Sequence, residues 1–509
     1  MPASNTIDSN STGLAYAEEL TPKVLPGSPT WFGLEPNGYD DFGGEITTVA
    51  REPISANRQN KRGTTTDLDA SGGFGLDFVQ RDLARLLQGF FFRDALEKIS
   101  TKPLNTAQSP ITSVDVLNGQ YNASGGMPVF VIDRIFFASG FDDAANNGIG
   151  IVTAVNANDI ETDKTTVADA APNADAIVES VGHEFATGDL ELTVSGGLAT
   201  FTSAAVDMTT LELNVGEWIF VGGDLSANQF PDGTGYFRIS EITATTIVCD
   251  KAEDLKITSS GTGKEIRIFF GTYLKNASDP ANIVCRTYQL ERTLGNDGSG
   301  VQSEYLTGSY ANEFNLAFAT ATKLESSMSF VALDNEQRDG TTGVKSGTRV
   351  ASNGDDAYNT SSDVRRQLMN VIDSATLNPT ALFAFLSEFN ININNNVSPV
   401  KAIATLGAIS VALGNFVVSG SLTAYFTTVA ATQAVRNNAD VTIDAIIAKK
   451  NAGWAFDIPL LGLGGGKANV EKDSPITIPL ENFAAENDNG YTMSFTQFQY
   501  LPTVAMPTA

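Results

Sequence analysis

The sequence predicts a mainly β protein: two β-sandwich or β-barrel domains, each with a flanking helix, and a small β-barrel domain inserted in the first. Two observations predict this fold class, a strict alternation of apolar side chains and its recurrence in two halves of the chain. The composition agrees, because 46 Gly and 19 Pro among 509 residues suit short strands joined by turns. A chain of this length has room for two to four domains.

The clearest alternation covers residues 416–426, and a shorter one covers residues 389–393. A period of two, rich in β-branched and aromatic residues, is typical of a half-buried strand. Gly414 and Asn415 precede the longer run and suit a turn. The residues expected on one face are Phe416, Val418, Gly420, Leu422, Ala424 and Phe426.

The same pattern recurs near the N-terminus, where Ala70–Phe78 aligns without a gap with Val418–Phe426. Each copy leads into a helix-like pattern, predicted over Val79–Lys98 after the first copy and over Thr427–Asn437 after the second. Because a repeat in sequence indicates a repeat in structure, we expect a duplicated domain in which Gly72 superposes on Gly420.

In chain order, we expect five segments. Residues 1–30 are polar and punctuated by proline, which favours an N-terminal arm that becomes ordered only against a neighbour. The other expected segments are the first domain (31–141 and 273–338), the inserted small β-barrel (142–272), a flexible loop (339–362) and the second domain (363–509).

Two of these segments carry further expectations. The insert shows short strands separated by turns, and its Trp218 is expected to be a core aromatic. Because its strands alternate independently, the insert is predicted to be a separate barrel. At the start of the second domain, the spacing of Val364, Leu368, Val371 and Ile372 predicts a helix.

None of the catalytic or ligand-binding patterns that we considered is complete in this sequence. His183 is the sole histidine, which excludes a histidine-based zinc site. The glycine-rich run 462–468 is one residue short of a phosphate loop and lacks Ser or Thr after Lys467. The run 295–300 lacks the distal Glu of a calcium loop. Two cysteines cannot form a disulfide framework. We therefore expect no enzyme, no metal and no cofactor.

The net charge of −27 disfavours nucleic-acid binding through phosphate contacts, which require clustered Lys and Arg. Residues 51–62 are a local exception and contain Arg51, Arg58, Lys61 and Arg62. The sequence has no apolar run of membrane-spanning length. Its first residues lack the basic and apolar regions of a secretion signal, so we expect the protein to be made and kept in a cytoplasm, or to leave it by lysis.

Two stretches of this chain resemble the tail tube proteins of long-tailed phages. The first is SPTWFGLEPNGYDDFGGEITTVAREPISANRQNKRGTTTDLDASGGFGLDF, followed by RDLARLLQGFF. The second is AIATLGAISVALGNFVVSGSLTAYF. This resemblance implies β-sandwich tube domains whose sheets join into rings, with the rings stacked into a tube in the virion tail. It implies no catalytic residues.

From this resemblance we expect a structural subunit whose channel conducts genomic DNA during ejection without binding it specifically. Since single-copy relatives form six-membered rings, a duplicated chain is expected to form homotrimeric rings, with other tail proteins at the tube ends and no membrane. Arg51, Arg58, Lys61 and Arg62 are the candidate contacts between subunits. Asp67, Asp69 and Asp77 are the candidate acids facing the lumen. The alternatives are a secreted or surface-layer β-rich structural protein and an enzyme with an unrecognised site.

Overall fold

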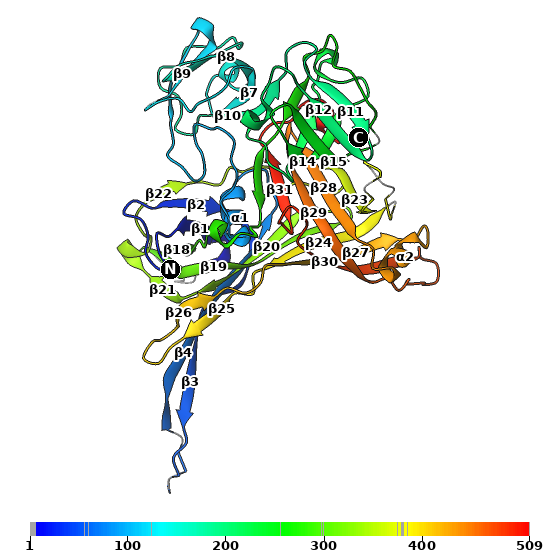
Figure 1. Cartoon of the computed structure of the whole chain (residues 1–509). Coiled ribbons are helices and arrows are strands. Elements are labelled where there is room, and N and C mark those ends of the chain that lie inside the picture. Colours follow the sequence, from blue (N-terminus) through cyan, green and yellow to red (C-terminus); the bar gives the residue numbers. More distant parts are fainter. Residues whose placement is uncertain are drawn as a thin grey trace. The chain divides into compact units, whose positions relative to one another are not determined.

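The computed structural model of the chain is mainly β and divides into two compact units (Figure 1). It describes residues 7–507 except 55, 57, 60, 124, 255, 297, 299, 374, 378–380 and 384. Residues 1–6 of the expected arm therefore lie outside the described residues. Unit 1 comprises residues 1–93, 279–360 and 386–423, and unit 2 comprises residues 94–278, 361–385 and 424–509.

Unit 1 is built from two ladders of strands that share the long strand β19, Val301–Ala319. The first half of β19 pairs with β18 and β21, and its second half pairs with β20 and β24. The other elements of the unit are β1 (Gly13–Glu18), β2 (Thr30–Leu34), β3 (Pro36–Arg51), β4 (Lys61–Asp77), α1 (Ala84–Phe91), β18 (Tyr288–Asn296), β20 (Glu325–Ala332), β21 (Asp334–Arg338), β22 (Thr348–Val350), β24 (Leu386–Asn394), β25 (Ser398–Lys401) and β26 (Ala408–Ala412).

The N-terminal segment is part of this fold, contrary to the expected arm. Strand β1 lies between β18 and β2 and pairs antiparallel with both. Its residues from Leu14 to Ala17 are buried. These four residues are mostly apolar, although polar residues surround them in the sequence, and they pack in the core. The prediction of an arm ordered only by a neighbour is therefore wrong for residues 13–18.

Helix α1 covers the core of unit 1 with one apolar face, on which Leu86, Leu87, Phe90 and Phe91 are buried. The ring of Phe90 lies 5.4 Å from the ring of Phe330, centroid to centroid. The helix is shorter than the predicted span 79–98. Asp82 and Phe92 have positive φ angles of 73° and 47°, and this left-handed backbone cannot continue a helix.

Unit 2 contains a twelve-stranded sheet in the order β11-β12-β15-β14-β13-β16-β10-β7-β8-β9-β6-β5. These strands are β5 (Ile111–Asp115), β6 (Gln120–Ala123), β7 (Arg134–Ser139), β8 (Gly148–Val155), β9 (Asp159–Thr162), β10 (Ile177–Glu184), β11 (Glu191–Ser195), β12 (Leu198–Thr202), β13 (Trp218–Val221), β14 (Gly235–Ile242), β15 (Thr246–Ala252) and β16 (Arg267–Phe269). The sheet thus starts well before the predicted insert boundary at residue 142, since β7 lies between β8 and β10 in the same sheet.

The rest of unit 2 is a second group of strands with a short helix. Strand β28 pairs with β23 and β29, and β31 joins β29 to β17. These elements are β17 (Thr272–Lys275), β23 (Val364–Val371), α2 (Ala430–Arg436), β28 (Val441–Lys449), β29 (Ala452–Gly465), β30 (Thr477–Ala484) and β31 (Ser494–Phe498). The helix predicted around Val364 is wrong, because this segment is strand β23.

The predicted insert is not a separate barrel, because it shares a hydrophobic core with the C-terminal strands of unit 2. Trp218 is a core aromatic, as expected, but its cluster also contains Ile446 from β28, Ala455 from β29 and Phe498 from β31. Tyr236 on β14 donates a hydrogen bond of 3.1 Å from its hydroxyl to the Ala505 carbonyl oxygen.

A buried network of charges joins the same two groups of strands. Arg238 Nη1 lies 3.2 Å from both carboxylate oxygens of Asp457, and Arg238 Nη2 lies 2.8 Å from Asp250 Oδ2. Asp444 accepts from Lys251 and from Arg366. Three cations therefore face three carboxylates. Burial alone raises the pKa of Asp444, but Arg366 and Lys251 outweigh burial and hold that pKa below its usual value.

The duplicated motif appears as a strand followed by a helix in both places. Strand β4 precedes α1, and β27 (Val417–Tyr425) precedes α2. The alternation in β27 is confirmed, because Val418, Leu422 and Ala424 are at most 1% exposed. Superposition of the two halves remains a prediction.

Candidate assembly surface

Unit 1 carries a long hairpin of β3 and β4, whose strands have 16 and 17 residues (Figure 1). The two strands pair along their whole length, from Pro36 opposite Leu76 to Arg51 opposite Lys61. On β3, the described residues from Glu45 to Arg51 are all exposed. Since an isolated two-stranded ribbon is only marginally stable in water, an exposed hairpin of this length is a candidate surface for a partner.

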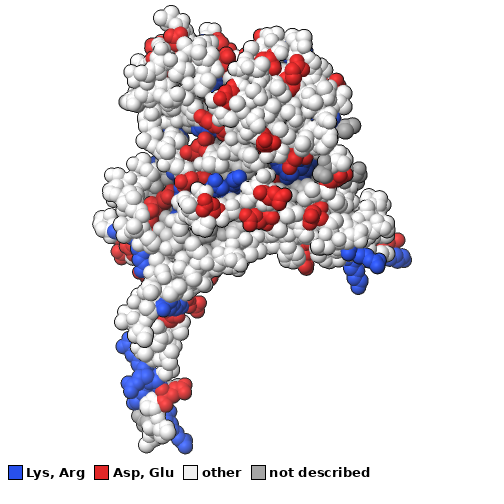
Figure 2. All heavy atoms as spheres, in the orientation of Figure 1, with Lys and Arg blue, Asp and Glu red and all other residues white. Residues whose placement is uncertain are grey.

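The far end of this hairpin is basic (Figure 2). Arg51 and Lys61 end the two strands opposite each other, and Arg62 follows on β4. Arg58 lies in the loop with a left-handed φ of 54°. All four side chains are exposed, and Glu52 is the one acid among residues 51–62. The structure thus brings the four candidate contacts together at one tip.

Large aliphatic side chains are exposed beside these charges. Ile54 in the loop is fully exposed, and Ile46 and Val49 on β3 are 56% and 53% exposed. The β25–β26 hairpin of the same unit exposes Ile403 fully and half of Ile409. Exposed aliphatic residues gathered in this way are typical of a protein–protein contact.

The three candidate lumen acids lie further along β4, and lysines pair with all of them. Lys401 on β25 forms salt bridges with both Asp67 and Asp69. Lys323 lies 2.5 Å from Asp77 Oδ1. The hydrogen bond from Lys401 lowers the pKa of the Asp67 carboxyl. The paired lysines therefore offset part of the negative charge of these acids.

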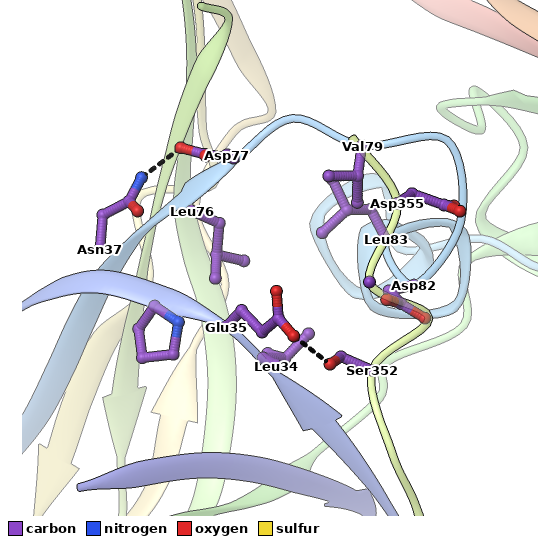
Figure 3. A pocket seen from close by; sticks show the side chains of 12 residues that line it. Leu34, Glu35, Asn37, Leu76, Asp77, Val79, Asp82, Leu83, Ser352 and Asp355 are labelled. Carbon is purple, nitrogen blue, oxygen red and sulfur yellow. Dashed lines mark hydrogen bonds between the residues drawn. The ribbon is translucent and has the colours of Figure 1, made fainter. Parts of the chain in front are cut away.

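A cavity of about 170 Å³ lies at the opposite end of the same hairpin (Figure 3). Its apolar lining comes from Leu34, Pro36, Leu76, Val79 and Leu83, and its carboxylates come from Glu35, Asp77, Asp82 and Asp355. We call this cavity the acidic pocket.

Only some of the carboxylates of the acidic pocket have a cationic partner. Arg81 binds Asp355 with two side-chain hydrogen bonds of 2.6 and 3.0 Å. Glu35 accepts from the Ser352 hydroxyl at 2.6 Å, and Asp82 accepts from the Asn353 backbone amide at 2.9 Å. Among the described residues, neither Glu35 nor Asp82 is in a salt bridge. Burial raises the pKa of the Asp82 carboxyl.

The ligand patterns considered in the sequence form no chemical site in the described part of the chain. His183 is 4% exposed and packs edge-on against Phe185. Burial, with Arg134 nearby, lowers its pKa to about 4, so it is neutral at pH 7. Within the described ranges, no cluster of three or more metal-ligating side chains occurs. Asp297 and Ser299 of the run 295–300 lie outside the described residues.

A comparison with protein families decides the identity of this fold. The family described as phage tail tube protein matches residues 9–485, which is most of the chain. The chain belongs to the phage tail tube protein family. A search of curated proteins found no match to it.

Membership of this family gives the protein a structural role in the virion tail, where it assembles with itself and with other tail proteins into a tube. Tail tube proteins are typically non-enzymatic. No described helix is both long and apolar enough to cross a membrane.

The acidic pocket of this tail tube protein was not recognised in the sequence. Asp355 lies in the segment predicted to be a flexible loop (339–362), whereas its side chain binds Arg81, which precedes α1. The pocket brings the loop 352–355 against residues near β3 and β4 that lie more than 270 positions earlier in the sequence. The sequence feature that could have indicated this pocket is the excess of acidic residues near the start of β3 and near the end of β4.

Proposed function

We propose that this tail tube protein forms rings that stack around a channel and conduct genomic DNA during ejection. The observation that carries the proposal is the family match over residues 9–485. The exposed hairpin supports it, because the described basic and aliphatic side chains at the tip of β3 and β4 are exposed. No catalytic step is part of this function.

The contacts between subunits are proposed to involve Arg51, Arg58, Lys61 and Arg62. They suit this role because they are exposed together at the end of one hairpin rather than spread over the surface. The ring is proposed to hold three chains, since each chain has the strand-then-helix arrangement twice, at β4–α1 and at β27–α2.

The channel wall is proposed to be acidic, with Asp67, Asp69 and Asp77 among its residues. DNA carries one charge per about 1.7 Å, so a basic wall would hold it through counterion release, whereas an acidic wall lets it slide. Because Lys401 and Lys323 pair with these acids, the repulsion is weak. Screening over about 8–10 Å weakens it further at physiological salt.

Electron microscopy of the purified full-length chain tests this function. We expect rings or tubes of uniform width, and native mass spectrometry of isolated rings should give three copies. Six copies per ring would contradict the stoichiometry alone. A chain that stays monomeric at all concentrations, with its β-sheet signal intact, would contradict the tube itself.

A further inference from the structure

One hairpin carries opposite charges at its two ends. At the loop end are the basic tip residues Arg51, Arg58, Lys61 and Arg62, with fully exposed Ile54 among them. At the base, β3 begins beside the acidic pocket, and β4 ends beside it (Figure 3). The tip and the pocket cannot meet within one copy, because the paired strands hold them a hairpin's length apart.

The two ends are also complementary in their apolar groups. The pocket combines an apolar lining, from residues such as Leu34 and Leu83, with a carboxylate rim. The tip combines an aliphatic side chain, Ile54, with surrounding cations. A cationic side chain with an apolar stem, or an isoleucine flanked by cations, matches such a lining and rim.

We propose that the basic tip of one copy docks in the acidic pocket of the next copy. This inference rests on the proposed function and names the surface that receives the tip. The contact is head-to-tail, since the tip and the pocket are different surfaces of the same chain. A head-to-tail contact that does not close on itself repeats without limit, which is the geometry that stacking requires.

Charge favours a second copy as the occupant. The whole chain has a net charge of −27, whereas residues 51–62 contain four bases and one acid. A partner of opposite sign is therefore available on every other copy. Glu35 and Asp82 have no salt-bridge partner among the described residues and can accept an incoming cation. DNA would satisfy the cations but would leave Ile54 exposed to water.

Charge reversal at each end of the contact tests the proposal in the full-length protein. The tip variant is Arg58→Glu with Arg62→Glu, and the pocket variant is Glu35→Lys. Glu35 suits this change because it is exposed and its described side-chain contact is with Ser352. The matched control, Lys467→Glu with Lys472→Glu, makes the same charge change as the tip variant at exposed positions of unit 2.

We expect each variant to raise the concentration needed for polymerisation at least about tenfold, while the control leaves it unchanged. Circular dichroism should show the same β signal in all of them. In an equimolar mixture, the intact tip of the pocket variant can dock in the intact pocket of the tip variant, but no further contact can follow. The mixture should therefore form discrete dimers of the unit that each variant makes alone. Combining Arg58→Glu with Glu35→Lys should restore part of the polymerisation.

Two outcomes would overturn the inference while leaving the tube intact: polymerisation that no reversal affects, and a mixture of tip and pocket variants that forms no dimers. Loss of binding to a short DNA duplex, with polymerisation unchanged, would assign the tip to DNA instead. If the wild-type chain forms no polymer at all, the proposed function fails first, so the two failures are distinguishable.

Discussion

Replacing Arg238 with methionine should destabilise unit 2 strongly, because it leaves Asp457 buried without its main cationic partner. Asp457 is 0% exposed, and Arg238 Nη1 lies 3.2 Å from both of its oxygens. The Tyr491 hydroxyl donates only a long hydrogen bond of 3.5 Å to Asp457. Removing one partner of a buried ion pair costs about 3–5 kcal/mol.

The second carboxylate that Arg238 binds, that of Asp250, adds little to this loss of stability. The Asp250 side chain is 33% exposed, so water can solvate it once the guanidinium is gone. The double variant Arg238→Met with Asp457→Asn should therefore recover a large part of the stability, since it buries no uncompensated charge. Arg436→Met is the matched control: it removes an exposed arginine of unit 2 and should change stability by less than about 0.5 kcal/mol.

Urea unfolding followed by tryptophan fluorescence measures these differences. Of the three tryptophans, Trp218 and Trp454 lie in unit 2 and are at most 1% exposed. Hydrogen exchange of β14, β28 and β29 then localises the loss. A single variant that loses less than about 1 kcal/mol would refute the reasoning, and so would a double variant that loses as much as the single one.

Three further predictions concern buried and paired side chains. Between pH 6.5 and about 4, His183 takes up a proton in the unfolded chain but not in the folded one, so the free energy of unfolding should fall by about 3 kcal/mol as the pH is lowered through this range. Denaturation at several pH values measures this loss, which should be absent in His183→Leu. Phe90→Ala should cost unit 1 about 3–5 kcal/mol, measured by urea unfolding, because Phe90 is fully buried. Lys401→Met should raise the pKa of Asp67, measured by NMR titration, and an unchanged pKa would contradict the pairing.

Strands whose buried side chains are apolar and alternate were predictable from the sequence, whereas strand β23, which buries an arginine, was predicted as a helix. In β27 and β24 the buried side chains are apolar, so the alternation shows directly. In β23 the buried residues include Arg366 and Asn370, and Arg366 is satisfied by Asp444 on β28. Because that partner is 78 positions away, nothing local in the sequence indicates that an arginine faces inward.

The extent of the insert was missed for a related reason. Short apolar runs before residue 142 match both a main-domain strand and a strand of the inserted sheet. Hydrogen bonding decides between them, since β7 pairs with both β8 and β10. The basic tip, by contrast, could be predicted, because its cations are close together in sequence and a hairpin keeps them together in space.

The distribution of charge explains how a strongly acidic chain can associate with itself. Like charges on most of the surface oppose random association and keep the free subunit soluble. In unit 2, the buried carboxylates Asp444 and Asp457 face internal cations, so their charge neither repels a neighbour nor attracts one. In unit 1, the hairpin separates a basic tip from an acidic pocket. In the proposed contact, attraction between copies comes from the orientation in which the tip of one copy meets the acidic pocket of the next. Under this proposal, charge selects the register of the contact, and the exposed aliphatic side chains Ile46, Val49 and Ile54 supply apolar surface to bury once that register is reached.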